Sequence, residues 1–390
     1  MTEKQKTPEA ETPQEEVPEV GAQTEPTGPA LEATTRRRRT RRRPRPETRD
    51  ADDDSVWPID TFQRLQAGTV TPIVGDSIST STLFGDDYPA LIEKWAKQVG
   101  YPWTLRFNRT RVAQFYRMRE DARASRSFYL SFLQEELLER ADNNPNVSDR
   151  QWNKVIEGLE NKSDAPPSIS RIAEMLGFAD FKSQPQHPLS LLASLPLPVY
   201  ITTSYHQFLE IALEQHGKTP VSEVYPWRKE LRGKFESIYE RKPGWQPDTN
   251  SPLVYHLFGR DDYADSLVLT ENDYLDFLVR VSQDLTLVGD LDGLPTRVED
   301  TLVLSTLFLL GYDMEVWDFR VLFRGLIKAK NDERNSQGVA IQLDKTDQKD
   351  KDRVRRHLEN YFLETSKLKV FWGPPTDCLS ELKSYWEGNL

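Results

Sequence analysis

Short apolar runs spaced along the chain are the feature that most limits what this sequence can fold into. Three of them have the length and composition of buried strands: Val70–Val74, Pro198–Thr202 and Leu302–Leu310. Each run ends in or beside Gly, Ser or Thr, and a helical pattern comes after it. Two more runs, Leu253–Leu257 and Leu267–Leu269, flank a Gly-Arg-Asp-Asp turn. The runs predict an α/β fold, a parallel sheet covered by helices on both faces.

The pattern changes between about residues 104 and 183, where apolar residues recur at helical spacing. Val112, Phe115 and Tyr116 form one such stripe, and a longer one runs from Phe128 to Leu138. Ser168 comes after two prolines and is placed to cap a further helix. We therefore predict a helical insertion over about 104–183, within a domain that spans residues 55–390.

The first 54 residues differ in composition from the rest. Residues 1–32 carry a net charge of −6, residues 33–49 a net charge of +8 through the run Arg36–Arg45, and residues 50–54 a net charge of −4. The segment contains no aromatic residue, so it cannot bury enough surface to offset the entropy of ordering. We predict a disordered arm over 1–54. Two interpretations of the arginine run stay open, nucleic-acid binding and a solvated tail balanced by its acidic neighbours.

Composition excludes several classes of protein. A single cysteine, Cys378, among 390 residues excludes a disulfide framework and a zinc site built on thiolates. The sequence has no apolar run of about 18 residues and no secretory signal, so we expect a cytoplasmic protein without a membrane helix. The histidines His187, His216 and His357 have no metal-ligand spacing, and we predict no metal site.

The turn after the first apolar run is a candidate nucleotide-binding loop. Gly75, Asp76 and Ser77 lie where an open parallel sheet turns its backbone N–H groups toward a diphosphate. Asp76 would repel phosphate unless it contacts a ribose hydroxyl. Because only one glycine is present and the dinucleotide fingerprint has three, an ordinary strand-end turn is the alternative.

Other strand ends carry small or polar residues where ligands bind in such sheets. These are Thr202, Thr203 and Ser204 at the carboxyl end of the second run, and Gly311, Tyr312 and Asp313 after the last. His256 lies within an apolar strand just before Gly259. A histidine so placed is either a hydrogen-bonded core residue or a catalytic base, and both interpretations stay open at this point.

Five motifs in this order resemble the sirtuin-like domains of bacterial anti-phage defence proteins. Gly75–Ser79 is similar to the family's Gly-Ala-Gly-x-Ser loop, and Ile201–Glu210 is similar to its Ile-Thr-Thr-Asn-Tyr-Asp-x-Phe-Leu-Glu segment. Tyr255–Gly259 is similar to the family's His-Leu-x-Gly strand, and Ser266–Tyr274 to the segment after that strand. Leu309–Arg320 is similar to its Leu-Gly-Tyr-Ser-x-x-Asp-x-Asp-Phe-Arg motif. The closing Phe371-Trp372-Gly373 also fits. The resemblance covers about residues 70–390 and implies a Rossmann-like, sirtuin-like sheet.

The resemblance also implies an activity, the binding of NAD and its hydrolysis to ADP-ribose and nicotinamide. His256 aligns with the family's catalytic base, and Ser204 aligns with the asparagine that orients the ribose and the water. The residues that would hold NAD are Gly75, Asp76, Ser77, Thr202, Thr203, Gly311, Tyr312 and Asp313.

The sequence departs from the family at several of these positions. Serine at 204 is shorter than asparagine and lacks its paired donor and acceptor, and His206 replaces an aspartate. A second hypothesis is therefore a catalytically weak NAD- or ADP-ribose-binding or scaffold module that acts with a partner. Partners implied by the resemblance are further copies of the chain and an activator such as a HerA-type ATPase or a short Argonaute. The absence of a four-cysteine zinc ribbon argues against protein deacetylation.

Overall fold

The computed structural model describes residues 60–102, 108–161, 166–235, 237–286, 294–312, 317–322, 325, 339–343, 351–366 and 368–388. The predicted arm, residues 1–54, lies outside these ranges, and so does Asp313.

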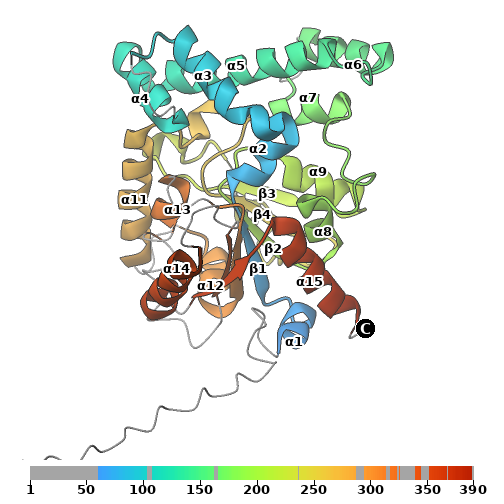
Figure 1. The fold of residues 1–390 in the computed structure, drawn as a ribbon, viewed down its shortest axis with the longest axis vertical. Coiled ribbons are helices and arrows are strands. Elements are labelled where there is room, and N and C mark those ends of the chain that lie inside the picture. The colour runs from blue at the N-terminus through green and yellow to red at the C-terminus, as the bar shows by residue number, and fades with distance from the viewer. Residues whose placement is uncertain are drawn as a thin grey trace, which may run out of the picture. The chain divides into compact units, whose positions relative to one another are not determined.

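Seven parallel strands form one sheet, in the order β3-β4-β2-β1-β5-β6-β7. The strands are β1 (Val70–Val74), β2 (Val199–Thr202), β3 (Val221–Val224), β4 (Leu253–His256), β5 (Thr306–Leu310), β6 (Val339–Leu343) and β7 (Leu368–Trp372). The predicted Rossmann-like α/β fold is thus confirmed (Figure 1). After β1 the chain crosses to β2 on one side, and β5 pairs with β1 on the other side.

Two apolar runs were assigned incorrectly from the sequence. Leu302–Leu310 is not one strand, because its first residues end helix α12 (Thr296–Leu304) and only Thr306–Leu310 is β5. Leu267–Leu269 forms no strand, because its backbone groups bind elsewhere: the Leu267 carbonyl accepts from the Arg126 side chain, and the Leu269 N–H donates to the Asp273 carboxylate. Strands β3, β6 and β7 were not predicted.

Successive side chains of each strand point to opposite faces of the sheet, so the core consists of two layers, one on each face. In β1, Ile73 faces one layer and Val74 the other, and Ile201 and Tyr200 of β2 divide in the same way. Both faces of the sheet are therefore covered, which explains why the strands are apolar throughout.

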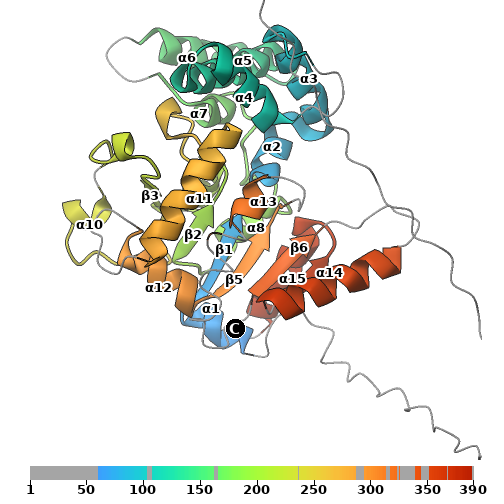
Figure 2. The same cartoon turned by 90° about the vertical axis from the view of Figure 1, so that its left-hand side faces the viewer.

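Helices surround the sheet on both sides (Figures 1 and 2). Those that contribute to the layer containing Val74 include α2 (Asp76–Phe84), α3 (Tyr88–Gln98), α8 (Pro188–Ser194), α9 (Phe208–Gln215) and α15 (Pro375–Glu387). Those of the layer containing Ile73 include α11 (Glu271–Thr286), α12, α13 (Trp317–Leu322) and α14 (Lys351–Ser366). The structure also has several short helices: α1 (Thr61–Gln66), η2 (Gly85–Asp87), η3 (Lys229–Leu231), α10 (Ile238–Arg241) and η4 (Ala264–Ser266).

The segment predicted as a helical insertion contains α4 (Arg109–Arg119), α5 (Ala122–Asp142), α6 (Asp149–Glu160) and α7 (Ile169–Met175). Ser168 caps α7, as its sequence context predicts, by accepting from the Arg171 N–H. In both views these helices lie at the end of the sheet where β1 runs into α2 (Figures 1 and 2). A buried ion pair between Arg126 of α5 and Asp273 of α11 joins the insertion to the sheet layers. The insertion therefore lies over the strand ends where ligands bind.

Candidate functional site

The loops after β1 and β5 approach each other closely at the point where the strand connections change direction. The Gly75 N–H donates to the Leu310 carbonyl at 2.8 Å, and the Ser77 hydroxyl donates to the Gly311 carbonyl at 2.6 Å. A Cβ atom on Gly75 would lie 2.3 Å from the Gly311 carbonyl oxygen, so only glycine permits this approach. In open α/β sheets, ligands bind at this change of direction, beyond the carboxyl ends of the strands.

A cavity of about 540 Å³ lies at these two loops. Its size is in the range of small-molecule sites. Asp76, Ser77, Gly311 and Tyr312, four of the predicted ligand-binding residues, line it. Its other lining residues come from α2 and α3, the start of α4, and α13: Thr80, Ser81, Gly85, Tyr88, Pro89, Ile92, Asn108, Arg109, Thr110, Trp317 and Asp318. Asp313 is outside the described residues, so its predicted role stays a prediction.

Two carboxylates and one guanidinium form the charged part of this cavity. Arg109 forms an ion pair with Asp76, and its second terminal nitrogen lies 3.5 Å from Asp318. The Tyr274 hydroxyl donates to Asp318 and lies 3.4 Å from the Arg109 guanidinium. Burial lowers the pKa of Arg109, but Tyr88 and Asp76 raise it, and the final value is well above the ordinary one. Arg109 is therefore a permanent cation in the cavity.

Burial raises the pKa of the Asp318 carboxyl. The Arg109 guanidinium opposes this shift, and the negative charge of Asp76 adds to it. Asp76 and Asp318 share one arginine, so the cavity favours the binding of a ligand that donates hydrogen bonds to these carboxylates or neutralises their charge.

Thr202, Thr203 and Ser204, the predicted residues at the carboxyl end of β2, lie behind this charged cluster. The Ser204 hydroxyl donates a hydrogen bond to the Asp76 carboxylate at 3.0 Å and accepts one from the backbone N–H of His206 at 3.2 Å. The Thr202 hydroxyl donates to the Val74 carbonyl. The Thr203 and Tyr312 hydroxyls are 2.9 Å apart. Thr202, Thr203 and Ser204 are not among the residues that line the cavity, and all three are buried. They support the wall of the cavity in this conformation.

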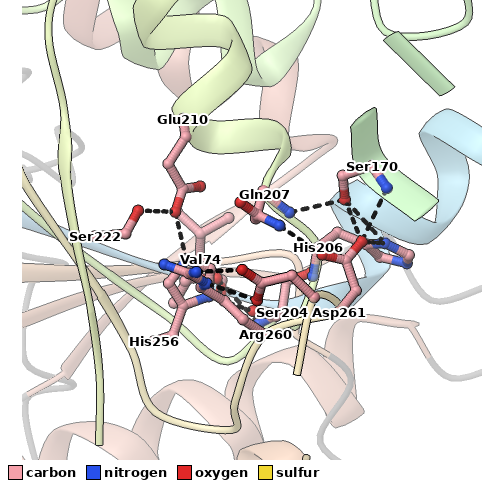
Figure 3. Close-up of polar contacts among 12 residues, drawn as sticks. Val74, Ser170, Ser204, His206, Gln207, Glu210, Ser222, His256, Arg260 and Asp261 are labelled. Carbon is pink, nitrogen blue, oxygen red and sulfur yellow. Dashed lines mark hydrogen bonds and ion pairs between the residues drawn. The ribbon is translucent and has the colours of Figure 1, made fainter. Parts of the chain in front are cut away.

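His256 is completely buried, and both of its ring nitrogens are bonded to protein groups (Figure 3). Nε2 lies 2.6 Å from the Glu210 carboxylate, and Nδ1 lies 3.1 Å from the Ser204 carbonyl. The carbonyl can only accept, so Nδ1 carries a hydrogen. Glu210 also accepts the Ser222 hydroxyl at 2.6 Å. Burial raises the pKa of Glu210, but His256 and Ser222 lower it more, so the carboxylate is ionised beside the imidazole.

The bonds to Glu210 and Ser204 fix the position of the His256 imidazole, which is separated from the cavity by Ser204 and Asp76. His256 contacts the Ser204 backbone, and the Ser204 side chain contacts Asp76, a wall residue. His256 itself is not among the lining residues. Its catalytic role therefore stays a prediction.

His206 belongs to a separate buried cluster that includes Ser170, Gln207 and Asp261 (Figure 3). The Ser170 hydroxyl donates to Asp261 at 2.6 Å, and His206 Nδ1 lies 3.6 Å from the same carboxylate oxygen. In a catalytic serine triad the base contacts serine and acid through different nitrogens. Here Nδ1 faces both groups, so the cluster does not match that geometry. It joins α7 of the insertion to the loops after β2 and β4.

A second cavity, of about 680 Å³, lies at the β3 edge of the sheet. Glu223, Tyr255 and Arg297 are among its lining residues, and no residue of the predicted site is. Within the described ranges, no group of three or more His, Cys, Asp or Glu side chains could hold a metal ion. No helix in the described part of the chain is long and apolar enough to cross a membrane.

The fold is an α/β fold with a cavity at the change of strand direction. Residues 198–366 match the model of the SIR2-like domain family, and this match supports a sirtuin-like family with an NAD-related function. The matched range begins at β2 and includes β3 to β6 and α14. No curated protein matches the chain.

Three side chains of this region were not singled out from the sequence: Arg109, Glu210 and Asp318. Arg109 is about 30 residues from its partner Asp76 and lies in the insertion, so no local pattern indicates their contact. Glu210 lies within a motif that resembles the family's, but its pairing with His256 depends on the packing of α9 against β4. Asp318 lies within the Leu309–Arg320 motif and matches the aspartate of the family's Asp-Phe-Arg, which is a signal that could have suggested it.

Proposed function

We propose that this protein binds NAD in the cavity between the β1 and β5 loops. The observation that supports this most is the position of the cavity at the change of strand direction, beside the amino end of α2. The capping residue of α2 is Gly75, which has no side chain to bond the first helical N–H groups. Such a helix end attracts a diphosphate.

The residues of the cavity fit the other parts of a dinucleotide. Asp76 and Asp318 can accept hydrogen bonds from ribose hydroxyls, and Tyr88 and Trp317 offer aromatic surface to the rings. The main mismatch is the repulsion between the carboxylates and a diphosphate, which Arg109 reduces.

A pair of cavity-filling variants tests the location. Ser81→Trp places an indole in this cavity without removing a polar contact from Asp76 or Arg109, and Gln246→Trp does the same in the second cavity. Isothermal titration calorimetry of the full chain with NAD is expected to show binding for the unmodified protein and for Gln246→Trp, and none for Ser81→Trp. Loss of binding in Gln246→Trp alone would place the site at the β3 edge, against the proposal.

Hydrolysis of NAD is the second candidate, and the contact of Ser204 with both Asp76 and His256 favours it. Hydrolysis breaks the bond between ribose and the pyridine nitrogen, water adds to the ribose carbon, and a base accepts the released proton. His256 would need to exchange its bond to Ser204 or Glu210 for a reactant. Binding without turnover is therefore better supported by this conformation than hydrolysis is.

Turnover is measured by release of nicotinamide from NAD. If the chain acts in anti-phage defence, cells that express it lose NAD after infection, and cells that express Ser81→Trp keep it. Unchanged NAD levels in infected cells of both kinds would count against the defence role while leaving binding untouched. Such a toxic activity requires control, which is the reason to include a co-expressed activator in the assay.

A further inference from the structure

Arg109 has an unusual origin and position among the residues of the cavity. It is the first residue of α4, in the helical insertion, and its side chain is 12% exposed. The helix is capped by Asn108, which accepts the Thr110 N–H at 2.9 Å. The guanidinium lies over the Tyr205 ring, 5.6 Å from its centre. The insertion therefore delivers one well-held cation to the strand ends.

Arg109 supplies the positive charge among the described residues that line the cavity. Of the described residues that line the cavity, Asp76 and Asp318 are acidic and Arg109 alone is basic. The chain as a whole has a net charge of −11, so no general attraction draws an anion to it. Besides the amino end of α2, Arg109 is the one cationic side chain that the described lining offers to a diphosphate.

The present partners of Arg109 are of the kind that a phosphate can replace. One terminal nitrogen is bound to Asp76, and the other is 3.5 Å from Asp318. Guanidinium binds carboxylate and phosphate through the same fork of N–H donors. A neutral group could not replace Asp76 without leaving a buried charge uncompensated, whereas a phosphate oxygen could.

We propose that Arg109 binds the diphosphate of the nucleotide, and that its transfer from Asp76 to phosphate frees Asp76 and Ser204 to face the ribose. This inference rests on the proposed NAD site and adds a specificity to it: ligands that carry a diphosphate bind more tightly than the corresponding nucleosides, and only their binding depends on Arg109. It also links ligand binding to the insertion, since α4 carries the residue that moves.

The test compares ADP-ribose with adenosine, using calorimetry on the full chain. The variants are Arg109→Gln and Arg109→Lys, and the matched control is Arg111→Gln, on the same helix, whose side chain is 54% exposed. We expect Arg109→Gln to weaken ADP-ribose binding by at least about tenfold, as loss of a hydrogen bond to a charged group does. Arg109→Lys is expected to lose less, Arg111→Gln nothing, and adenosine to bind weakly and equally to all.

A double variant separates a phosphate contact from simple neutralisation of Asp76. Arg109→Gln with Asp76→Asn removes both charges of the pair, so Asp76 is not left as an uncompensated buried carboxylate, while Asp318 keeps the Tyr274 hydroxyl as a donor. If Arg109 contacts phosphate, the double variant still binds ADP-ribose weakly. Recovery of full affinity in the double variant, or equal affinity in Arg109→Gln and the unmodified chain, would overturn the inference. If the unmodified chain binds neither ADP-ribose nor NAD, it is the proposed function that fails.

Discussion

The pair formed by His256 and Glu210 allows the catalytic and structural interpretations of the histidine to be separated. Replacing His256 by Leu removes the 2.6 Å contact to Glu210 and the 3.1 Å contact to the Ser204 carbonyl. Glu210, whose side chain is 4% exposed, would keep Ser222 as a partner, and its Oε2 atom has no hydrogen-bond partner among the described residues. Removing one member of a buried pair costs about 3–5 kcal/mol.

Such a loss is large against a total stability of about 5–15 kcal/mol. Glu210→Leu is expected to cost less, about 1–3 kcal/mol, because His256 keeps its bond to the Ser204 carbonyl. The double variant should be more stable than His256→Leu alone, since no buried carboxylate is left without its partner. The coupling energy is expected to reach at least about 1.5 kcal/mol.

Urea unfolding at pH 7, followed by tryptophan fluorescence and circular dichroism, measures these free energies. Nicotinamide release by the double variant then addresses catalysis in a protein that still folds. Additive losses within about 0.5 kcal/mol would refute the argument that the pair is energetically coupled. A stable double variant that has lost turnover would support the catalytic assignment of His256.

Three further predictions concern the elements around the site. Arg126→Met should lower the free energy of unfolding by at least about 1.5 kcal/mol, because it removes the 1% exposed side chain that bonds both Asp273 and the Leu267 carbonyl, while buried Asp273 keeps Arg117 at 3.2 Å. Arg123→Met, at a 79% exposed side chain, should change it by less than about 1 kcal/mol. Urea unfolding of both variants checks this, and equal losses would contradict it. Burial lowers the pKa of His187 to about 4, so the unfolded chain binds more protons between about pH 6.5 and pH 4. The protein should therefore become less stable as the pH is lowered from about 6.5 to 4, and His187→Asn, whose side chain can still cap α8, should lose less stability. If the melting temperatures of the two proteins change in parallel with pH, the prediction is wrong. Gly311→Ala should cost more than about 1 kcal/mol and weaken NAD binding, because φ is +70° and the new Cβ would lie 2.7 Å from a side-chain carbon of α2; an unchanged melting temperature would argue against this strain.

Strands β1, β2 and β4, which are buried along their whole length, were predictable because their signal is local. Val70–Val74 coincides with β1, and the second run differs from β2 by one residue. Partly exposed β3, at the edge of the sheet, has no continuous apolar run, and its pairing with β4 depends on residues about 30 positions away. Leu267–Leu269 has the composition of a strand, but Arg126 and Asp273 take its backbone groups.

The candidate site shows the same division. The sequence places small and polar residues at the ends of β1 and β5, and the cavity forms there, lined by Asp76 and Gly311. Local pattern could not place His256 relative to that cavity, because the decision rests on which side of β4 faces α9.

By itself, the sequence determines the alternation of apolar strands and helices, and hence a parallel sheet whose strand ends carry the polar residues. Those are local properties of burial and periodicity. Only the tertiary structure decides that Arg109 of the insertion reaches Asp76, that Ser204 lies behind this pair, and that Glu210 holds His256. The physical reason is that buried charges must be paired, and the chain brings their partners together from positions far apart in the sequence.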